Sequence, residues 1–306
     1  MDNLSRELER WLVMRKKNSV KPATLLRYYV TIDLLNKYRI SQLPIEYLNC
    51  DDIQGYFNHL VEDGYSKETI MKQKTVLFEF LKSIYLEGRI QRPFYQLAKI
   101  PSDINFKYKK REITAYTKEE QEKLLKVIES DDIPAYHAAI LMLETGMRAG
   151  EVMGLCWSDV QWNRKAIKIC RTIVKSAKNT DQYLQNTTKT TNSNRLIPLS
   201  SKAYSLLRRL SENNQNGIEY ILHDNEGNLL TYDYLKYWVS KACKEAGVPY
   251  RGQHIFRHTF ATNCYHKGCD VKILSRLLGH SNPTITYNIY IHLYGDGLEE
   301  MRSILD

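Results

Sequence analysis

The segment LETGMRAGEVMGL, residues 143–155, places an arginine and a carboxylate in a short connection between two predicted helices. Gly146 predicts the end of the first helix, because glycine adopts the left-handed conformation of a helix C-terminus at little cost. Glu151 lies early in the second helix, so the backbone of Arg148 is held in the turn while its side chain can reach outward. A surface arginine near a helix end has the same local pattern, so the segment alone leaves the role of Arg148 open.

The segment HIFRHTFAT, residues 254–262, predicts a helix that carries cationic and imidazole side chains. His254 and Arg257 are three residues apart and share a helix face. His254 and His258 are four apart, which also suits a metal pair, but there is no HExxH pattern and no neighbouring carboxylate. A guanidinium between the histidines repels a cation. We therefore expect no metal site, and a fork-shaped donor beside an imidazole suits a phosphate oxyanion.

A third segment, LGHSNPTITYNIYIHLY at residues 278–294, joins a helix end to two tyrosines. Gly279 predicts the end of a helix and His280 follows it directly, with Tyr287 and Tyr290 downstream. Each of these residues is ordinary when it is considered singly. Their order after the other two segments is what carries information.

That order resembles the tyrosine recombinase (phage integrase) family. Arg148 is followed by Lys189 in the polar turn of TKTTNSNRLIPLS (188–200), whose end matches R-x-I-P-L, then by H-x-x-R at 254–257 and Gly279-His280. A tyrosine follows about ten residues later. The resemblance spans roughly residues 113–306, is weaker over residues 1–110, and implies a mainly α fold with a small antiparallel β-sheet.

The resemblance also selects the nucleophile. Family members place it nine or ten residues after the histidine, commonly followed by Thr-His. Tyr290 lies ten residues after His280 and precedes Ile291-His292, whereas Tyr287 lies seven after and is interpreted as a packing residue.

The resemblance implies a metal-free, ATP-free and cofactor-free reaction at a phosphodiester. Attack by the tyrosine leaves a 3′-phosphotyrosine and a free 5′-hydroxyl, and another 5′-hydroxyl can reverse the step. The arginines clamp the non-bridging oxygens, His280 donates a further hydrogen bond, Lys189 protonates the leaving oxygen, and Glu151 orients the site. The implied catalytic set is Arg148, Lys189, His254 (proton transfer near the nucleophile), Arg257, His280 and Tyr290, with Glu151 beside it.

The length of 306 residues and the helical patterns predict two domains. Helical spacing runs through the first hundred residues, with Pro22 at a first helical position, Asp51 as a helix cap, and Gly64 and Gly88 as ends. Thr117 and Glu120 form a capping box that opens a new helix. We expect a helical core-type DNA-binding domain at 1–105, a basic linker at 106–115 and the tyrosine recombinase catalytic domain at 116–306.

The second domain mixes helices with strands. AIKICRTIVK, residues 166–175, has a strand-like pattern, and so do YLQNTTKT and RLIPLS around a polar TNSN turn. Helical spacing returns at 201–211, 231–246, 255–267 and 270–278.

The charge balance favours a nucleic-acid partner. The net charge is +9, and residues 1–112 hold 20 Lys and Arg against 14 Asp and Glu. The resemblance implies double-stranded recombination sites as substrate and a homotetramer on DNA, with the tail 297–306 docking on its own subunit or on a neighbour. An accessory directionality factor is a further expected partner. The candidate DNA contacts are Lys67, Lys72, Lys74, Lys107, Lys109, Lys110 and Arg111.

No apolar run approaches the roughly 20 residues of a membrane span, and the N-terminus carries charges where a signal peptide has an apolar stretch. The six cysteines form no CxxC pair and predict reduced thiols. We expect a cytoplasmic, nucleoid-associated protein.

Several functions remain open within this chemistry. The long segment 172–190 favours an integrase of a mobile element, whereas the two-domain length, without an arm-binding domain, favours an Xer-type chromosome-dimer resolvase. A type IB topoisomerase-like nicking enzyme shares the chemistry. A catalytically silent DNA-binding regulator is the alternative from another class, and the full set of candidate residues argues against it.

Overall fold

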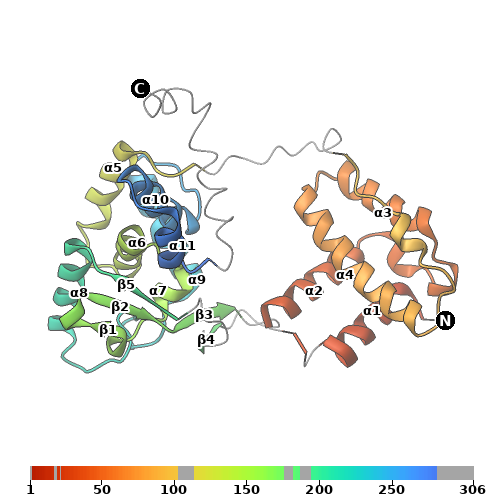
Figure 1. Ribbon diagram of the computed structural model, residues 1–306, viewed down its shortest axis with the longest axis horizontal. Helices are drawn as coiled ribbons and strands as arrows, with labels where there is room; N and C mark the ends of the chain where they lie inside the picture. The colour runs from red at the N-terminus through yellow and green to blue at the C-terminus, as the bar shows by residue number, and fades with distance from the viewer. Residues whose placement is uncertain are drawn as a thin grey trace. The chain divides into compact units, whose positions relative to one another are not determined.

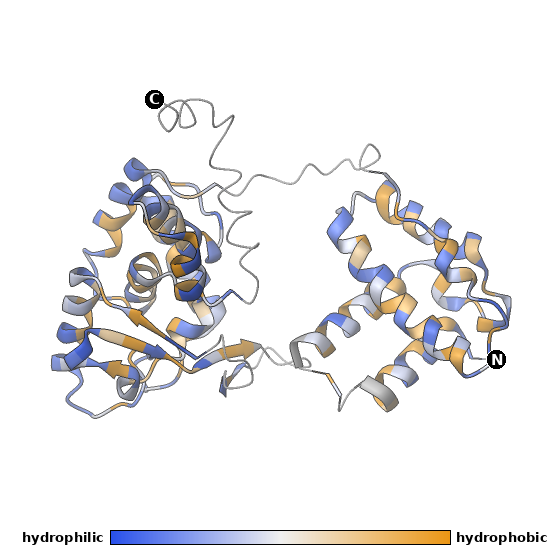
Figure 2. Cartoon of the chain, viewed as in Figure 1, coloured by the Kyte–Doolittle hydropathy of each residue, from blue (hydrophilic) through white to orange (hydrophobic). Residues whose placement is uncertain are grey.

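The computed structural model describes residues 2–16, 19–20, 22–102, 114–175, 182–186 and 194–280. These residues form two compact units, one from residues 2–102 and one from residues 114–174 and 182–280 (Figure 1). Each unit has its own cluster of buried hydrophobic residues. In Figure 2, hydrophobic and hydrophilic residues share the helices of both units, as expected of helices that bury one side.

The regular elements of the N-terminal unit, over its described residues, are helices joined by turns and loops. Its helices are α1 (Leu4–Trp11), which continues into the π-helical turn η1 (Leu12–Lys16), α2 (Pro22–Leu35), α3 (Cys50–Glu62) and α4 (Lys67–Leu86), with 3₁₀ turns at Arg39–Gln42, Ile45–Tyr47 and Phe94–Leu97. Pro22 begins α2, and Ser66 caps α4 by accepting the N–H of Thr69.

One expected cap is wrong. The side chain of Asn49, not Asp51, caps α3 by accepting the N–H groups of Asp51 and Asp52, and Asp52 accepts the N–H of Asn49 in return. Asn and Asp are about equally good caps, so the sequence alone did not separate them.

Aromatic rings fill the core of this unit. Trp11 packs edge-to-face against Tyr28 and Phe80, with ring centroids 5.9 and 5.8 Å apart. Phe57 and Phe80 are fully buried. Because α1, α2, α3 and α4 all contribute to one core, the unit is a folded module that presents its polar helix faces to solvent.

In the C-terminal unit one apolar helix, α6 (Pro134–Thr145), packs against most of the others. Almost all of its residues are buried. It contacts α5 (Lys118–Ile128), α7 (Ala149–Met153), α8 (Ser201–Asn213), α9 (Tyr232–Glu245) and α10 (His254–His266), and α10 in turn contacts α11 (Val271–Leu278). Thr117 and Glu120 form the expected capping box at the start of α5.

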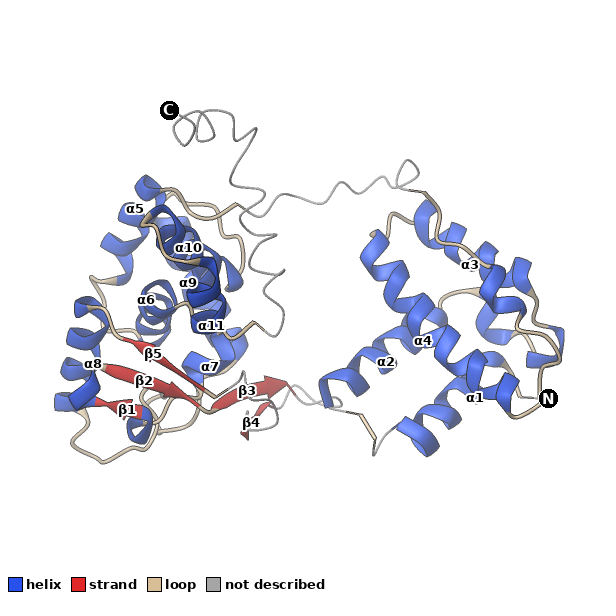
Figure 3. Ribbon diagram, in the orientation of Figure 1, coloured by secondary structure: helices blue, strands red, loops and turns tan. Residues whose placement is uncertain are grey.

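Two small sheets complete this unit (Figure 3). Strands β1 (Val160–Gln161), β2 (Ala166–Ile169) and β5 (Arg195–Pro198) form an antiparallel sheet in which Ile169 lies opposite Arg195. Strand β3 (Arg171–Lys175) pairs with β4 (Gln182–Asn186). The expected mainly helical fold with a small antiparallel sheet is confirmed.

The strand-like stretch 166–175 forms two strands, β2 and β3, which belong to different sheets and are separated at Cys170. Cys170 Sγ and Arg171 Nη2 donate to the same oxygen of Asp159, at 3.1 and 3.0 Å. Successive side chains of a regular strand point to opposite faces, so two neighbours that reach one carboxylate oxygen break the alternation.

Leu77 and Leu86 give a matched test of the N-terminal core, because both lie on α4 and 2% and 73% of their surfaces are exposed. We expect Leu77→Ala to lower the free energy of unfolding by about 2–5 kcal/mol through lost burial and a new cavity. Leu86→Ala should change it by less than about 0.5 kcal/mol. Urea unfolding of the full chain, followed by circular dichroism, measures both, and equal effects would contradict the assigned core.

Candidate active site

A sharp reversal after α6 brings Arg148 to the start of α7. Gly146 ends α6 with φ +67°, and a Cβ there would lie 2.4 Å from a ring carbon of Phe260. Both the backbone conformation and the lack of space therefore require glycine. Arg148 follows in the short connection that the sequence predicted, where it is the N-cap of α7.

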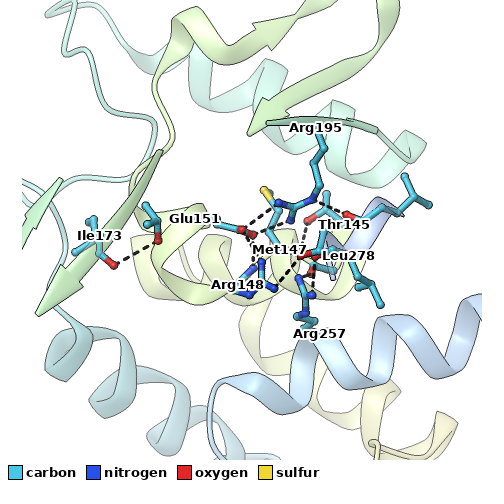
Figure 4. A network of polar contacts seen from close by, with 12 residues as sticks. Thr145, Met147, Arg148, Glu151, Ile173, Arg195, Arg257 and Leu278 are labelled. Atoms are coloured by element: carbon cyan, nitrogen blue, oxygen red, sulfur yellow. Dashed lines mark hydrogen bonds and ion pairs between the residues drawn. The ribbon is translucent and has the colours of Figure 1, made fainter. Parts of the chain in front are cut away.

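The carboxylate of Glu151 is the centre of a polar network (Figure 4). It accepts the backbone N–H of Arg148 at 2.9 Å and Nη1 of Arg148 at 2.9 Å. It also accepts Nη1 and Nη2 of Arg195 at 3.0 and 2.8 Å. Burial by itself would raise the pKa of Glu151, but the hydrogen bonds and charge of Arg195, with those of Arg148, lower it to about 2. The carboxylate is therefore ionised at neutral pH.

Arg257 lies buried between two helix C-termini. Its Nη1 donates to Gly146 O at the end of α6, at 2.9 Å, and its Nη2 donates to Leu278 O at the end of α11, at 2.6 Å. The last carbonyls of a helix have no partner within it and carry its negative dipole end, so a guanidinium is well placed there. Burial and the charge of Arg148 lower the pKa of Arg257 to about 9, which leaves it a cation at neutral pH.

Two histidines adjoin these arginines. His254 begins α10 one turn before Arg257, and partial burial with the charges of Arg257 and Arg148 lowers its pKa. His280 follows the C-cap Gly279 of α11, and its backbone N–H donates to Ser275 O at 3.1 Å. Burial, then the charges of Arg257, Arg148 and Arg195, lower the pKa of His280 to about 4. A neutral His280 still donates one ring N–H to an oxyanion.

The network holds an excess of positive charge in a partly desolvated site. Three guanidinium groups surround one carboxylate, which leaves two uncompensated positive charges. Arg148 also donates to Gly279 O at 3.3 Å, so its guanidinium faces the segment that carries His280. Like charges that are held together and partly desolvated favour binding of an anion, and they suit an anionic transition state more than a neutral ligand.

The structure brings together five of the residues that the sequence singled out. These are Arg148, Glu151, His254, Arg257 and His280, drawn from α7, α10 and the end of α11. Lys189, Tyr287 and Tyr290 lie outside the described residues. Their assignments stay predictions.

The part played by Arg195 was not predicted from the sequence, where this residue stands only as the first position of the R-x-I-P-L match. An arginine that opens a strand is usually exposed, yet only 7% of this side chain is exposed. Its partner Glu151 lies 44 residues earlier, so no local pattern links the two residues. The available signal was the place of Arg195 within the R-x-I-P-L match.

The candidate DNA contacts of the N-terminal unit differ in their surroundings. Lys74 Nζ donates to Ala98 O at 3.2 Å and lies 4.7 Å from the ring centroid of Phe78, so this lysine packs within its own unit. Lys72 is exposed and lines a shallow pocket with Arg27 and Lys37. Lys67 is half-buried at the start of α4. Lys107, Lys109, Lys110 and Arg111 lie outside the described residues.

Within the described ranges, no group of three or more His, Cys, Asp or Glu side chains could hold a metal ion. Those ranges also include no helix of the length and apolar character that a membrane crossing requires.

The model of the Phage integrase family matches residues 115–296, which covers more than half of the chain and includes every residue of the network. The chain belongs to this family, the tyrosine recombinases. The resemblance inferred from the sequence is confirmed.

Two relatives show the range of the family. A tyrosine recombinase XerC-like protein of Caldanaerobacter subterraneus subsp. tengcongensis is 29% identical over 305 residues, covering 92% of this chain and 77% of the relative. The transposase from transposon Tn916 of Enterococcus faecalis is 27% identical over 292 residues, covering 89% of this chain and 70% of the relative.

A solved structure shares the fold. The Tn1549 transposon integrase, in complex with transposon right end DNA, matches with a TM-score of 0.80 at 23% identity, covering 99% of this chain and 100% of the other. The arrangement of helices and small sheets is thus that of tyrosine recombinases.

The low pKa of His280 predicts a stability change with pH. The unfolded histidine binds its proton near pH 6.5 and the folded one only near pH 4, so the unfolded state binds more protons between these values. Stability is then lost as pH falls through this window. We expect the melting temperature of the wild type to fall more between pH 7.5 and pH 5 than that of His280→Gln, measured by calorimetry.

His266→Gln is the matched control, because His266 lies exposed at the end of α10. It should follow the wild type across this pH range. Parallel curves for wild type and His280→Gln would contradict the burial of this imidazole. Glu151 is present in all three proteins, so its own protonation cancels in the comparison.

Proposed function

We propose that this tyrosine-type site-specific DNA recombinase integrates and excises a mobile element, cutting each strand through Tyr290. The observation that carries the proposal is the buried cationic network around Glu151, which lies within the region that matches the family. Such a network fits a phosphodiester, because its surplus positive charge attracts the anionic phosphate and the adjoining His254 and His280 supply imidazole hydrogen-bond donors.

Arg148 and Arg257 bind the non-bridging oxygens of the scissile phosphate. The hydrogen bonds described above use two N–H groups of each guanidinium, and a guanidinium has five. His280 adds a neutral donor beside them. These groups stabilise the extra negative charge of the pentavalent phosphorus that forms during attack.

Tyr290 is the nucleophile. An unperturbed tyrosine has a pKa of about 10, so forming its phenolate at pH 7 costs roughly 4 kcal/mol, which the surrounding cations offset. The phenolic oxygen bonds to phosphorus, the bond from phosphorus to the 5′-oxygen breaks, and Lys189 protonates that oxygen. His254 assists proton transfer near the nucleophile. The 3′-phosphotyrosine keeps the phosphoester, so rejoining needs neither metal nor ATP.

A mobile-element role is favoured over chromosome-dimer resolution by the long segment 172–190 and by the relatedness to the Tn916 transposase. The XerC-like relative keeps an Xer-type resolvase as the second candidate. A silent DNA-binding regulator has no use for a buried phosphate-type site, so the network argues against it.

The substrate is double-stranded DNA that carries recombination sites. The N-terminal unit and the basic segment near residues 106–115 serve as the DNA-binding domain and linker, with phosphate contacts supplying much of the affinity. The working unit is a homotetramer on two sites, assisted by an accessory directionality factor, with residues 297–306 docking within or between subunits. We place the protein with the nucleoid in the cytoplasm.

Tyr290→Phe tests the nucleophile. On a nicked suicide substrate with the cognate site, the wild type should form a protein–DNA adduct that survives denaturation. Tyr290→Phe should form none, because the phenylalanine ring has no oxygen to bond to phosphorus. Gel mobility after denaturation measures the adduct.

Tyr287→Phe is the matched control and should keep adduct formation. Loss of the adduct in Tyr287→Phe alone, or its persistence in Tyr290→Phe, would overturn the assignment. Each reaction is also run in excess chelator, where the adduct should persist. An absence of adduct with any cognate DNA would favour the regulator.

A further inference from the structure

Arg195 joins three segments of the C-terminal unit through one side chain. It opens β5, six residues after Lys189 in the sequence. Its Nη1 and Nη2 donate to the two oxygens of Glu151 on α7, and its Nε donates to Leu277 O, near the end of α11, at 2.6 Å. All three nitrogens of the guanidinium are thus engaged within the protein (Figure 4).

Glu151 and the Leu277 segment both also contact residues proposed to bind the phosphate. Glu151 holds both the backbone N–H and Nη1 of Arg148. Leu277 is followed by Leu278, whose carbonyl accepts a hydrogen bond from Arg257. Gly279 comes next, and its carbonyl accepts one from Arg148. His280 follows directly. The guanidinium of Arg195 therefore binds both segments that orient Arg148, Arg257 and His280.

The close fit around Gly279 shows how tightly this junction is packed. A Cβ at Gly279 would lie 3.0 Å from Nη1 and 3.1 Å from Cζ of Arg195, and the residue has φ +65°. The turn that carries His280 therefore rests directly on the Arg195 guanidinium. Because that guanidinium is planar and fixed by three hydrogen bonds, it is a rigid support for the turn.

We propose that Arg195 is a positioning residue for strand cleavage, which holds Arg148 through Glu151 and holds the His280 turn through Leu277. The inference rests on the proposed function and deepens it. We assign Arg195 no phosphate contact, because three of its five N–H groups, including Nε, are used within the protein, against two for Arg148 and two for Arg257. It acts by keeping the phosphate-binding groups aligned, and a misplacement of about 1 Å in such groups lowers a rate by up to about 100-fold.

Arg195→Lys tests this role, because lysine keeps the charge and loses the planar fork. Arg251→Lys is the matched control. Arg251 also forms a two-point pair, with Nη1 and Nη2 each 2.8 Å from an oxygen of Glu120, but shares no partner with the Glu151 network. We expect Arg195→Lys to cleave the suicide substrate about 10- to 100-fold more slowly than the wild type at saturating DNA, with DNA affinity unchanged. Arg251→Lys should cleave like the wild type.

Two further readouts separate positioning from a structural role. A substrate with a methylphosphonate at the scissile position lacks one negative charge and needs less help from Arg148 and Arg257. The Arg195→Lys defect should be clearly smaller on it. The defects of Arg195→Lys and Glu151→Gln should also not multiply in the double variant, because both break the same contact.

The outcomes are distinct. Wild-type-like cleavage by Arg195→Lys overturns this inference and leaves the proposed function standing, whereas a wild type that cleaves no cognate DNA overturns both. Equal defects on the two substrates, multiplying defects in the double variant, or a cleavage loss that only follows loss of the folded state in melting curves would each overturn the positioning role.

Discussion

The ion pair between Glu151 and Arg195 buries two charged side chains, with 5% and 7% of their surfaces exposed, where α7, β5 and the end of α11 meet. Desolvating two ions is costly, and only good geometry with further hydrogen bonds repays it. Here both oxygens and all three guanidinium nitrogens are used. Removing one partner of such a pair typically costs about 3–5 kcal/mol, so the arrangement of the whole site depends on it.

This pair permits a concentration of like charge that a protein core would otherwise disfavour. Arg148 and Arg257 lie close enough for each to oppose protonation of His280, and Arg148 lowers the pKa of Arg257. Helix carbonyls at Gly146, Leu278 and Gly279 offset part of this repulsion, and Glu151 offsets more. Two positive charges remain beyond the one carboxylate, and this surplus suits the phosphate of the proposed function.

The sequence predicted the elements better than the contacts between them. Gly146 and Gly279 were correctly expected to end helices, because their left-handed conformation is a local property. The break at Cys170 depends on the side chain of Asp159, and the burial of Arg195 depends on Glu151, so neither is a local property. Arg148 and Glu151 were assigned from the order of motifs along the chain. The order of motifs indicates which residues form one site, but it does not indicate which atoms form hydrogen bonds with one another.

The most direct test of the central claim is a structure of Tyr290→Phe bound to its recombination site. We expect non-bridging oxygens of the scissile phosphate to lie within hydrogen-bond distance of Arg148, Arg257 and His280. We also expect both oxygens of Glu151 to remain paired with Arg195. A phosphate held by other residues, or a Glu151 that releases Arg195 when DNA binds, would contradict the central claim.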